Sequence, residues 1–338
     1  MELPKPRLEP RRRVVPAAGA LPAPTRPFPP ARLIPLPGRA PEDVVVGADG
    51  QLYCGLEGGA IVRVDPTTLR TEVVADTGGR PLGLLAYDDG LIVCDSHRGL
   101  LRVDPATGSV DALVERVDGV PLRFCSNAAL APDGAIWFTE SSTRFGFEHY
   151  MGAFLEHRPS GRLLRRDPDG TVTVIHTELD FPNGLTLAPS QDALIMVETG
   201  GYRISRVRLA DGATTTLTAN LPGFPDNLSI FRDGLAWVAF TNPRSAALDR
   251  AGRLPGWVRR AIWRLPDALI PGPREAIWVR AITEHCETVH DIRSVRGDFA
   301  MATGVVEHDG FLYVAGPPQG ALLRLDLSGS APEADNRA

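Results

Sequence analysis

Short apolar runs alternate with turn-forming residues along most of the chain. Pairs of such runs flank a turn, and their second members read QLYCGL, AIWFTE, LAWVAF and FLYVAG. The pattern is typical of β-hairpins. The clearest example is FPNGLTLAPSQDALIMVET, residues 181–199, in which two apolar runs flank a Pro-Ser-Gln-Asp turn. Long amphipathic helical patterns do not interrupt the hairpins, so the chain is expected to be all-β.

The turn inside these hairpins recurs six times. It occurs at Asp49-Gly50, Asp89-Gly90, Asp133-Gly134, Gln191-Asp192, Asp233-Gly234 and Asp309-Gly310. Successive aspartates lie 40, 44, 59, 41 and 76 residues apart. A period of about 40 to 45 residues filled with short strands is the signature of a β-propeller blade, and two intervals carry insertions. We predict a six-bladed β-propeller with four-stranded blades and short helical insertions, in preference to a βαβ fold, because helical patterns occur only in the insertions.

The predicted propeller covers residues 31–328. Residues 1–30 form a Pro- and Arg-rich N-terminal tail, expected to be disordered or to lie as an extended strap over the propeller edge, with a basic interaction arm as the alternative. Residues 329–338 are expected to be a disordered C-terminal tail. The segment ARLIPL, Ala31 to Leu36, is expected to pair with the last blade and so to close the ring and cover two strand edges.

Composition and charge limit the partners. The chain is 43% hydrophobic and 23% charged, and its 34 glycines and 31 prolines suit a loop-rich all-β protein. A net charge of −5 indicates no basic field for nucleic acid, although a local patch could escape a whole-chain count. The expected partner is a small-molecule substrate, and the oligomeric state is left open. No secretory signal or membrane anchor is predicted in the proline-rich N-terminal tail.

The four cysteines show no metal-binding spacing and are expected to be free, buried thiols: Cys54, Cys94, Cys125 and Cys286. With no predicted export signal, free thiols favour a cytoplasmic location.

The two insertions differ in character. The first, Ser142 to Gly161, is rich in aromatic residues, and we expect it either to pack over the propeller or to cap an active site. The second runs from Pro243 to about Arg280 and contains WVRRAIWRLPDALI, whose apolar residues near helical spacing predict a short helix.

Four polar residues stand six to nine positions before a hairpin turn: Glu42, Asn127, Asn183 and Asp226. Inner strands line the central channel of a propeller, so residues at their starts converge on one mouth of it. Two carboxylates and two carboxamides offer only oxygen ligands, which suits Ca²⁺ ahead of Mg²⁺ or Mn²⁺ and argues against zinc. The alternative is that each residue caps its own turn.

Several segments together resemble the superfamily that contains senescence marker protein/gluconolactonase, paraoxonase and strictosidine synthase. They are PEDVVV, FCSNAALAPDGAIWFTESS, FPNGLTLAPSQDALIMVETGGYRISRV, GFPDNLSIFRDGLAWVAF and GVVEHDGFLYVAG. The resemblance runs from about Arg39 to Leu327 and is nearest to bacterial strictosidine synthase-like proteins.

The resemblance implies a metal site. In the metal-dependent relatives, residues matching Glu42, Asn183 and Asp226 hold a divalent cation, and an asparagine in the region of Asn127 binds metal or substrate. Here a Ser126-Asn127 pair stands in place of the usual Asn-Asp pair. Which of these two residues occupies the family's asparagine position is left open.

Two departures from the relatives limit the reaction. The catalytic glutamate of strictosidine synthase corresponds to Thr303, so the Pictet–Spengler condensation of that enzyme is not expected. The catalytic histidine of paraoxonase falls near Leu82 and its partner near His97, so a histidine dyad of that type is incomplete.

The expected function is metal-dependent hydrolysis of a lactone or an ester, with a cation that polarises the carbonyl and Asp226 as the base that activates water. The expected substrate-binding residues are Ser126, Asn227, His97 and Thr303. Because the chain has no GxSxG motif, a serine esterase is disfavoured. Two alternatives remain, a non-hydrolytic strictosidine synthase-like enzyme of cyclisation or condensation and a non-catalytic binding propeller.

Overall fold

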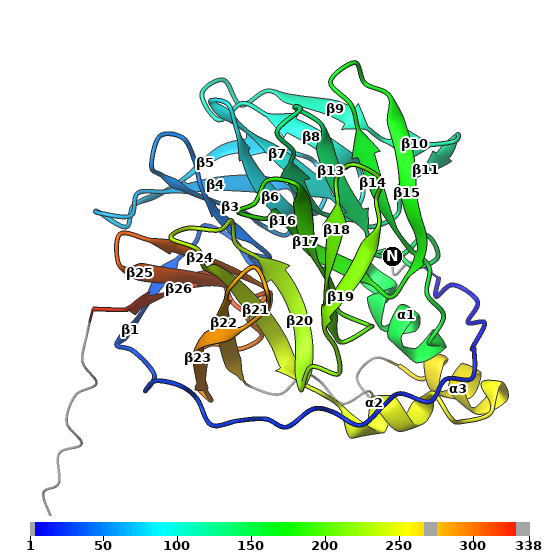
Figure 1. Ribbon diagram of the computed structural model, residues 1–338. Coiled ribbons are helices and arrows are strands. Elements are labelled where there is room, and N and C mark those ends of the chain that lie inside the picture. Colours follow the sequence, from blue (N-terminus) through cyan, green and yellow to red (C-terminus); the bar gives the residue numbers. More distant parts are fainter. Residues whose placement is uncertain (1–3, 267–275, 329–338) are drawn as a thin grey trace, which may run out of the picture.

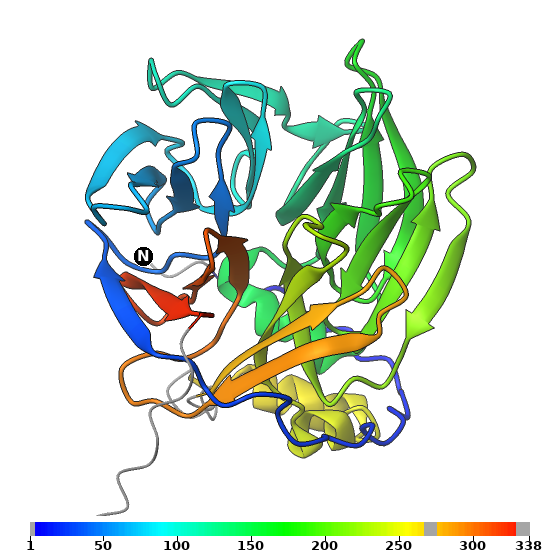
Figure 2. The same ribbon diagram turned by 60° about the vertical axis from the view of Figure 1, so that its left-hand side comes forward.

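A computed structural model describes residues 4–266 and 276–328 of the protein. Six four-stranded antiparallel sheets stand around a central axis (Figure 1, Figure 2). This arrangement confirms the predicted six-bladed β-propeller. The C-terminal tail predicted at residues 329–338 lies outside the described residues.

Each of blades one to five runs from the channel outwards in chain order. Blade one comprises β2 (Val44–Val46), β3 (Leu52–Gly55), β4 (Ala60–Val64) and β5 (Thr71–Asp76). Blade two comprises β6 (Pro81–Tyr87), β7 (Gly90–Asp95), β8 (Gly99–Val103) and β9 (Val110–Val114). Blade three comprises β12 (Cys125–Leu130), β13 (Ile136–Glu140), β14 (Gly161–Arg166) and β15 (Val172–Leu179). A small hairpin of β10 (Arg116–Val117) and β11 (Val120–Pro121) precedes blade three.

Blade four comprises β16 (Pro182–Leu187), β17 (Ala193–Glu198), β18 (Arg203–Arg208) and β19 (Thr214–Thr218). Blade five comprises β20 (Gly223–Leu228), β21 (Ala236–Pro243), β22 (Ile277–Ile282) and β23 (Thr288–Ser294). Blade six takes β24 (Gly304–His308), β25 (Phe311–Ala315) and β26 (Ala321–Asp326) from the end of the chain. All six predicted turns join the first and second strands of a blade.

The ring closes through its N-terminal strand, as predicted. Strand β1 (Ala31–Pro35) pairs antiparallel with β26 and becomes the outermost strand of blade six. Ala31 lies opposite Leu325, and Pro35 lies opposite Ala321. The two ends of the propeller therefore share one sheet, and β26 has no free edge.

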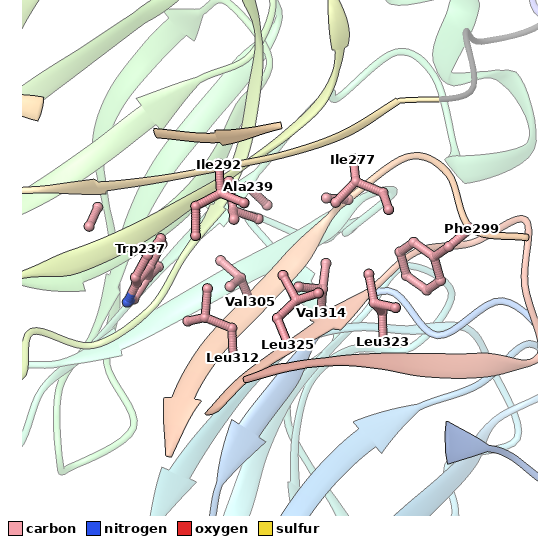
Figure 3. Packing of buried hydrophobic residues seen from close by; sticks show 13 residues of the cluster. Trp237, Ala239, Ile277, Ile292, Phe299, Val305, Leu312, Val314, Leu323 and Leu325 are labelled. Atoms are coloured by element: carbon pink, nitrogen blue, oxygen red, sulfur yellow. The ribbon is translucent and has the colours of Figure 1, made fainter. Parts of the chain in front are cut away.

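Burial follows from the stacking of blades. The second strands β7, β13 and β17 are almost wholly buried because both of their faces contact neighbouring strands, whereas the outermost strands β5 and β19 are largely exposed or half-buried. Figure 3 shows one interface, where Trp237, Ala239 and Ile277 of blade five meet Val305 and Leu325 of blade six. The hydrophobic core is thus divided among successive blade interfaces.

Glycine permits close contact of inner strands near the channel. A Cβ atom on Gly184 would lie 2.6 Å from the backbone oxygen of Asp226 and 2.6 Å from the backbone nitrogen of Leu228. We expect Gly184→Ala to destabilise the protein by about 1 to 3 kcal/mol, because neither backbone atom can move alone. Gly297, whose Cβ would meet no atom within 4 Å, is the matched control. Chemical denaturation measures both variants, and equal stability of the two would contradict the close contact.

Both insertions contain helices. The first, between β13 and β14, forms a 3-10 turn η1 (Phe147–His149) and helix α1 (Tyr150–Glu156). The second, between β21 and β22, forms α2 (Ala246–Ala251) and α3 (Gly256–Trp263), which confirms the predicted short helix. No helix among the described residues is long and apolar enough to cross a membrane.

The predicted thiols are free within the part of the chain that the structure describes. Cys54, Cys94 and Cys125 are buried, and Cys286 is half-buried.

Residues 4–30, here called the N-terminal strap, run along α2, α3 and the outer edge of blade five without forming a strand (Figure 1, Figure 2). The strap is held at intervals by its backbone. The amide of Arg11 donates to the Glu156 carbonyl at 2.9 Å, and the amide of Arg13 donates to the Gly252 carbonyl at 2.9 Å. Further along, the amide of Thr25 donates to the Asp291 carbonyl of β23 at 3.0 Å.

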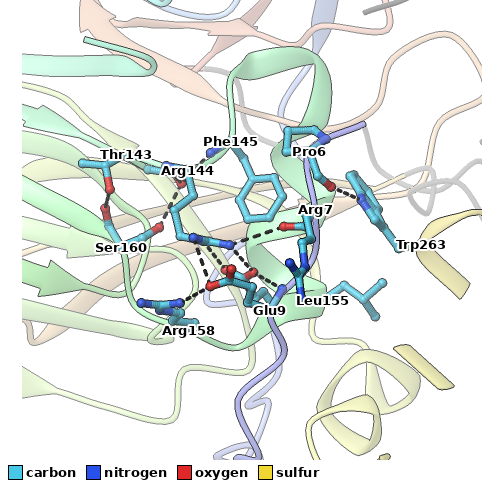
Figure 4. A network of polar contacts seen from close by, with 12 residues as sticks. Pro6, Arg7, Glu9, Thr143, Arg144, Phe145, Leu155, Arg158, Ser160 and Trp263 are labelled. Carbon is cyan, nitrogen blue, oxygen red and sulfur yellow. Dashed lines mark hydrogen bonds and ion pairs between the residues drawn. The ribbon is translucent and has the colours of Figure 1, made fainter. Parts of the chain in front are cut away.

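Side chains also fix the strap to the first insertion (Figure 4). Leu8 is 2% exposed and packs in a cluster with Phe145, Leu155 and Trp263. The buried Glu156 carboxylate accepts a hydrogen bond from the Glu9 amide at 2.5 Å and two from the Arg144 guanidinium at 2.9 and 3.0 Å. The strap is therefore fixed to α1 through Glu156 and Leu155.

Candidate functional site

The polar residues at the channel mouth lie in β-bulges at the starts of inner strands. In β12, β16 and β20, the pairing with the next strand skips two residues. The first residues of these bulges are Ser126, Asn183 and Asp226, and the second are Asn127, Gly184 and Asn227. A bulge leaves its residues outside the ladder and re-aims their side chains, here from three blades at equivalent positions.

Asn183 forms hydrogen bonds with the first bulge residues of the two adjacent blades, Ser126 and Asp226. Its Oδ1 accepts a hydrogen bond from Ser126 Oγ at 2.8 Å, and its Nδ2 donates to Asp226 Oδ1. Asn183 Nδ2 also lies 3.5 Å from Thr199 Oγ1. Ser126, Asn183 and Asp226 are all buried. The structure therefore brings these three sequence-predicted residues into one contiguous, solvent-shielded group.

Asn127 lies one residue further along its strand and has different partners. Its Nδ2 donates to Asn227 Oδ1 at 3.0 Å, and its Oδ1 accepts from the Ala128 amide at 2.8 Å. Ser126, and not Asn127, therefore occupies the position equivalent to Asn183 and Asp226. A role for Asn127 as a metal ligand stays a prediction.

Hydrogen bonds also link blades five, six and one at the same mouth. The amide of Asn227 donates to the Thr303 carbonyl at 3.1 Å. Thr303 Oγ1 in turn donates to the backbone carbonyl of Glu42 at 2.7 Å. Thr303 is 2% exposed, so its hydroxyl helps to join blade six to blade one. Substrate contacts of Asn227 and Thr303 stay predictions.

Glu42 enters the site from the loop before β2. It lies beside the guanidinium group of Arg80, which was not predicted from the sequence as part of the site. Its Oε2 lies 3.5 Å from Nη2 of Arg80, and these two side chains are 13% and 5% exposed. Arg80 Nη1 donates to the Ala40 carbonyl at 3.0 Å, whereas neither Arg80 Nη2 nor Glu42 Oε2 has a hydrogen-bond partner although both are buried. Two charged groups at the mouth thus have unused hydrogen-bonding capacity.

Burial dominates the electrostatics of the carboxylates. It raises the pKa of Glu42 to about 7, against a smaller lowering by Arg80. It raises the pKa of Asp43 to about 7 as well, although the Leu84 and Val44 amides donate to that carboxylate. The pKa of Asp226 is raised well above its usual range, first by burial and then by the charges of Glu42 and Asp43.

The first insertion packs over this mouth, as one of its two expected roles requires, and its role as the cap of an active site stays a prediction. Its segment Phe147 to Glu156 is here called the cap. Cap residues Phe147, Tyr150 and Phe154 pack with buried Leu82, Phe124 and Phe181, which all precede or begin inner strands. Burial and the charges of Glu42 and Asp226 raise the pKa of the Tyr150 phenol, so the cap lies beside the carboxylates.

Leu82 and His97 correspond to the histidine dyad of paraoxonase, but they do not face one shared polar site. Leu82 is buried in the apolar cluster beneath the cap. His97 Nε2 lies 2.6 Å from Glu148 Oε1 of the cap, and both side chains are more than a third exposed. His97 therefore ties blade two to the cap, and its contact with substrate stays a prediction.

A divalent cation fits the oxygen donors at the mouth. Glu42 and Asp226 are close enough for one charge to raise the pKa of the other, and Glu42 Oε2 lacks a hydrogen-bond partner. Positive charge between them would offset both the repulsion and the cost of burial. The described residues contain no cluster of three His, Cys, Asp or Glu side chains suited to a metal. A cation here would therefore also need the amide oxygen of Asn183 or the hydroxyl of Ser126.

Sequence reasoning missed Arg80 and Asp43 at the site. Asp43 directly follows Glu42, and Arg80 stands two residues before Leu82, the first bulge residue of β6. Counting back from the blade-two turn finds only Leu82 and Gly83, which carry no polar group. The available signal was the GRPLGL motif, in which a single arginine precedes an otherwise apolar inner strand.

The chain is similar in sequence to known proteins. Two family models match the chain, strictosidine synthase over residues 127–211 and strictosidine synthase-like, N-terminal, over residues 30–64. The adipocyte plasma membrane-associated protein of Salmo salar is 32% identical over 327 residues, and the match covers 85% of this chain and 77% of that protein. The chain belongs to the strictosidine synthase-like family. Both segments matched by the family models contain site residues, Glu42 in one and Asn127 and Asn183 in the other.

Solved structures place this strictosidine synthase-like chain within a wider set of propellers. A gluconolactonase from Xanthomonas campestris superposes with a TM-score of 0.63 at 20% identity, covering 93% of this chain and 98% of that one. A calcium-binding protein, regucalcin, from Agrobacterium tumefaciens superposes with a TM-score of 0.61 at 16% identity, covering 89% and 94%. At these identities the likeness establishes the shared propeller fold.

The raised pKa values predict how stability depends on pH. In the folded protein without a cation, Glu42 and Asp43 keep protons up to about pH 7, whereas the unfolded chain releases them near pH 4. The folded state then binds more protons than the unfolded state, so the free energy of unfolding is expected to fall as pH rises from about 5 to about 8. Calcium bound to the ionised carboxylates would reduce that fall.

Thermal unfolding across this pH range, with calcium and with a chelator, measures the effect. Chelated protein whose stability rises between about pH 5 and about pH 8 would contradict the burial of these carboxylates.

Proposed function

We propose that this strictosidine synthase-like protein is a metal-dependent hydrolase that acts on a lactone or an ester. The observation that carries the proposal is the contact of the buried Asn183 and Asp226 at the channel mouth, with the half-buried Glu42 close enough for its charge to act on Asp226, beneath an aromatic cap. The shared fold with a gluconolactonase and with a calcium-binding regucalcin supports it. Calcium is the proposed cation because all candidate ligands are oxygens.

Each residue of the site has a proposed role. A bound cation would supply Lewis acidity toward a carbonyl oxygen. The Asp226 carboxylate would accept a proton from the attacking water. Ser126 and Asn227 would orient the substrate through hydrogen bonds. Arg80 Nη2, which is buried without an acceptor, would donate to a substrate oxygen and stabilise negative charge there.

The cap favours a substrate with an apolar part. Phe147 and Tyr150 of the cap, with Phe124 and Phe181 beneath them, form an aromatic wall beside the carboxylates. Burial of the site means that substrate entry requires the cap to move, after which closure would exclude water from the polar groups. An aromatic or aliphatic lactone would match this wall better than a polyhydroxylated sugar lactone.

The reaction of strictosidine synthase itself is not proposed. Thr303 offers no carboxylate, and its hydroxyl is engaged by the Glu42 carbonyl. Two alternatives remain: a non-hydrolytic reaction of another kind and a non-catalytic binding propeller. One experiment distinguishes both of them from the hydrolase.

A panel of lactones and esters, assayed with calcium and with a chelator, tests the proposal. We expect turnover of at least one apolar lactone, loss of that turnover on chelation, and recovery when calcium is restored. Glu42→Gln should lose the turnover, whereas the exposed turn variant Asp309→Asn should keep it. Turnover that persists in chelator would refute metal dependence, and bound metal without turnover across the panel would favour a binding propeller.

A further inference from the structure

Positive charge and apolar side chains gather together on the second insertion. From Arg250 to Pro266 the chain contains five arginines and no acidic residue. One of them, Arg259, is buried and donates to the Leu155, Glu156 and Arg11 carbonyls. The other four are exposed. A chain with a net charge of −5 thus carries a local surface of opposite sign.

Helix α3 presents this surface through its helical period. Trp257, Arg260, Ala261 and Arg264 are exposed at spacings of three and four residues, while Arg259 and Trp263 are buried on the inner side. Trp257 is 69% exposed, which is unusual for so large an apolar side chain. Leu254 before the helix and Leu265 after it are also exposed. One face of α3 therefore combines indole, aliphatic and guanidinium groups.

The exposed arginines here have no acidic partners among the described residues. Arg250, Arg253, Arg260 and Arg264 make no side-chain hydrogen bond or ion pair within residues 4–266 and 276–328. Elsewhere on the surface, arginines commonly pair with a nearby carboxylate, as in Arg208 with Asp211 and Arg296 with Asp298, each at 2.6 Å. Among the residues that the structure describes, these four arginines therefore have no carboxylate that offsets their charge.

A groove of about 360 Å³ between the strap and α2 extends the surface. Its walls combine apolar residues with cations: Val15, Pro16, Ala17, Ala18 and Ala246 with Arg244, Arg250 and Arg253, beside Asp249. Arg244 has a 3% exposed side chain bonded to Asp249 and to the Pro16 carbonyl, yet its buried Nη1 has no hydrogen-bond partner. The groove thus offers the exposed guanidinium groups of Arg250 and Arg253 and an apolar wall to the same ligand.

We propose that this surface, Arg250 to Leu265 with the adjoining groove, docks on a lipid bilayer that contains anionic phospholipids. Trp257, Leu254 and Leu265 would enter the interfacial region, where amphipathic aromatic rings prefer to lie. The arginines would bind lipid phosphates, and the groove would take one headgroup. A nucleic acid would satisfy the charge but would leave the exposed indole and leucines in water, so the bilayer accounts for more of the surface.

Figure 1 and Figure 2 show α2 and α3 together at one edge of the ring, beside the cap. Helix α1 of the cap packs against both α2 and α3. Docking would therefore bring the cap close to the bilayer without any helix crossing it. The proposal concerns peripheral binding and stands independently of the reaction at the channel mouth.

Vesicle sedimentation of the full-length protein tests the docking. We expect binding to vesicles of phosphatidylcholine with about one quarter phosphatidylglycerol, little binding to phosphatidylcholine alone, and release at high salt. The double variant Arg260→Glu with Arg264→Glu should weaken binding at least tenfold, since each arginine is worth roughly a factor of five. Trp257→Ala should weaken it at least about fivefold, because the indole loses its apolar contact.

The matched control is Arg232→Glu. Arg232 is exposed in the turn between β20 and β21, at the opposite end of the blade-five strands from the insertion. This variant should bind vesicles as the wild type does, and thermal unfolding should show that all variants are folded. Brominated lipids should quench the tryptophan fluorescence of the wild type more than that of Trp257→Phe. The difference between the two reports the indole at position 257.

Three results would overturn the proposal. The first is no binding to either type of vesicle. The second is an equal loss of binding in Arg232→Glu, which would indicate only an effect of net charge. The third is binding of a DNA duplex, or self-association of the chain, that depends on Arg260 and Arg264 while vesicles are not bound.

Discussion

Asp226→Asn is expected to lower calcium-dependent turnover at least 100-fold, because a general base commonly contributes about 10² to 10⁴. The variant keeps the shape of the side chain but removes a charge from the proposed cation site and removes the proposed proton acceptor. It also relieves repulsion, since the charges of Glu42 and Asp43 already raise the pKa of Asp226. The folded protein should therefore be at least as stable as the wild type in chelator. Loss of activity with retained stability would separate chemistry from folding.

Two comparisons sharpen that result. Asp192→Asn alters an exposed turn aspartate that is bonded to Arg206 and Ser190, and it should leave turnover unchanged. Asn127→Ala removes the hydrogen bond to Asn227 and should lower turnover more than it lowers calcium affinity if Asn127 faces substrate. Wild-type turnover by Asp226→Asn in chelator would show that the reaction occurs elsewhere.

Deletion of residues 1–36 is expected to abolish the folded propeller. It removes β1, which pairs over five residues with β26, and Ile34, which is 1% exposed in the interface of blades one and six. The loss exposes a strand edge and opens a hydrophobic core, so the protein should aggregate or unfold without a cooperative transition.

Deletion of residues 1–25 should leave the ring intact but loosen the cap. The strap then no longer buries Leu8 against Phe145 and Trp263, a contact worth about 1.5 to 3 kcal/mol. Calorimetry should still show a cooperative transition, and limited proteolysis should cut the first insertion faster than in the wild type. Equal stability of the two truncations would contradict closure by β1, and an unchanged cleavage rate would contradict the role of the strap.

The fold was predictable from sequence because the turn chemistry is local. Asp49-Gly50 and the five related turns each mark one hairpin, and Gly50 and its equivalent Gly310 adopt positive φ angles of 74° and 77°. The strap was harder to predict. Leu8 is a lone apolar residue among prolines and arginines, and its burial depends on Phe145 and Trp263 from two insertions far away in the chain.

The contacts between candidate site residues were predictable where those residues repeat at equivalent blade positions. Asn183 and Asp226 hold such positions, and their contact follows from the shared register of β16 and β20. Bulges of two residues shift that register locally, so the sequence left Ser126 and Asn127 undecided. Arg80 was missed because it reaches the mouth from a connection before β6, where no repeat marks it.

Calcium titration of chelator-stripped protein tests the central claim most directly. We predict one calcium ion bound per chain, with uptake weaker at about pH 6 than at about pH 8 because the buried carboxylates must first lose protons. The double variant Glu42→Gln with Asp226→Asn should bind none, whereas Asp192→Asn should bind as the wild type does. Equal calcium uptake by the double variant, or no uptake by the wild type at millimolar calcium, would contradict a metal-dependent site at the channel mouth.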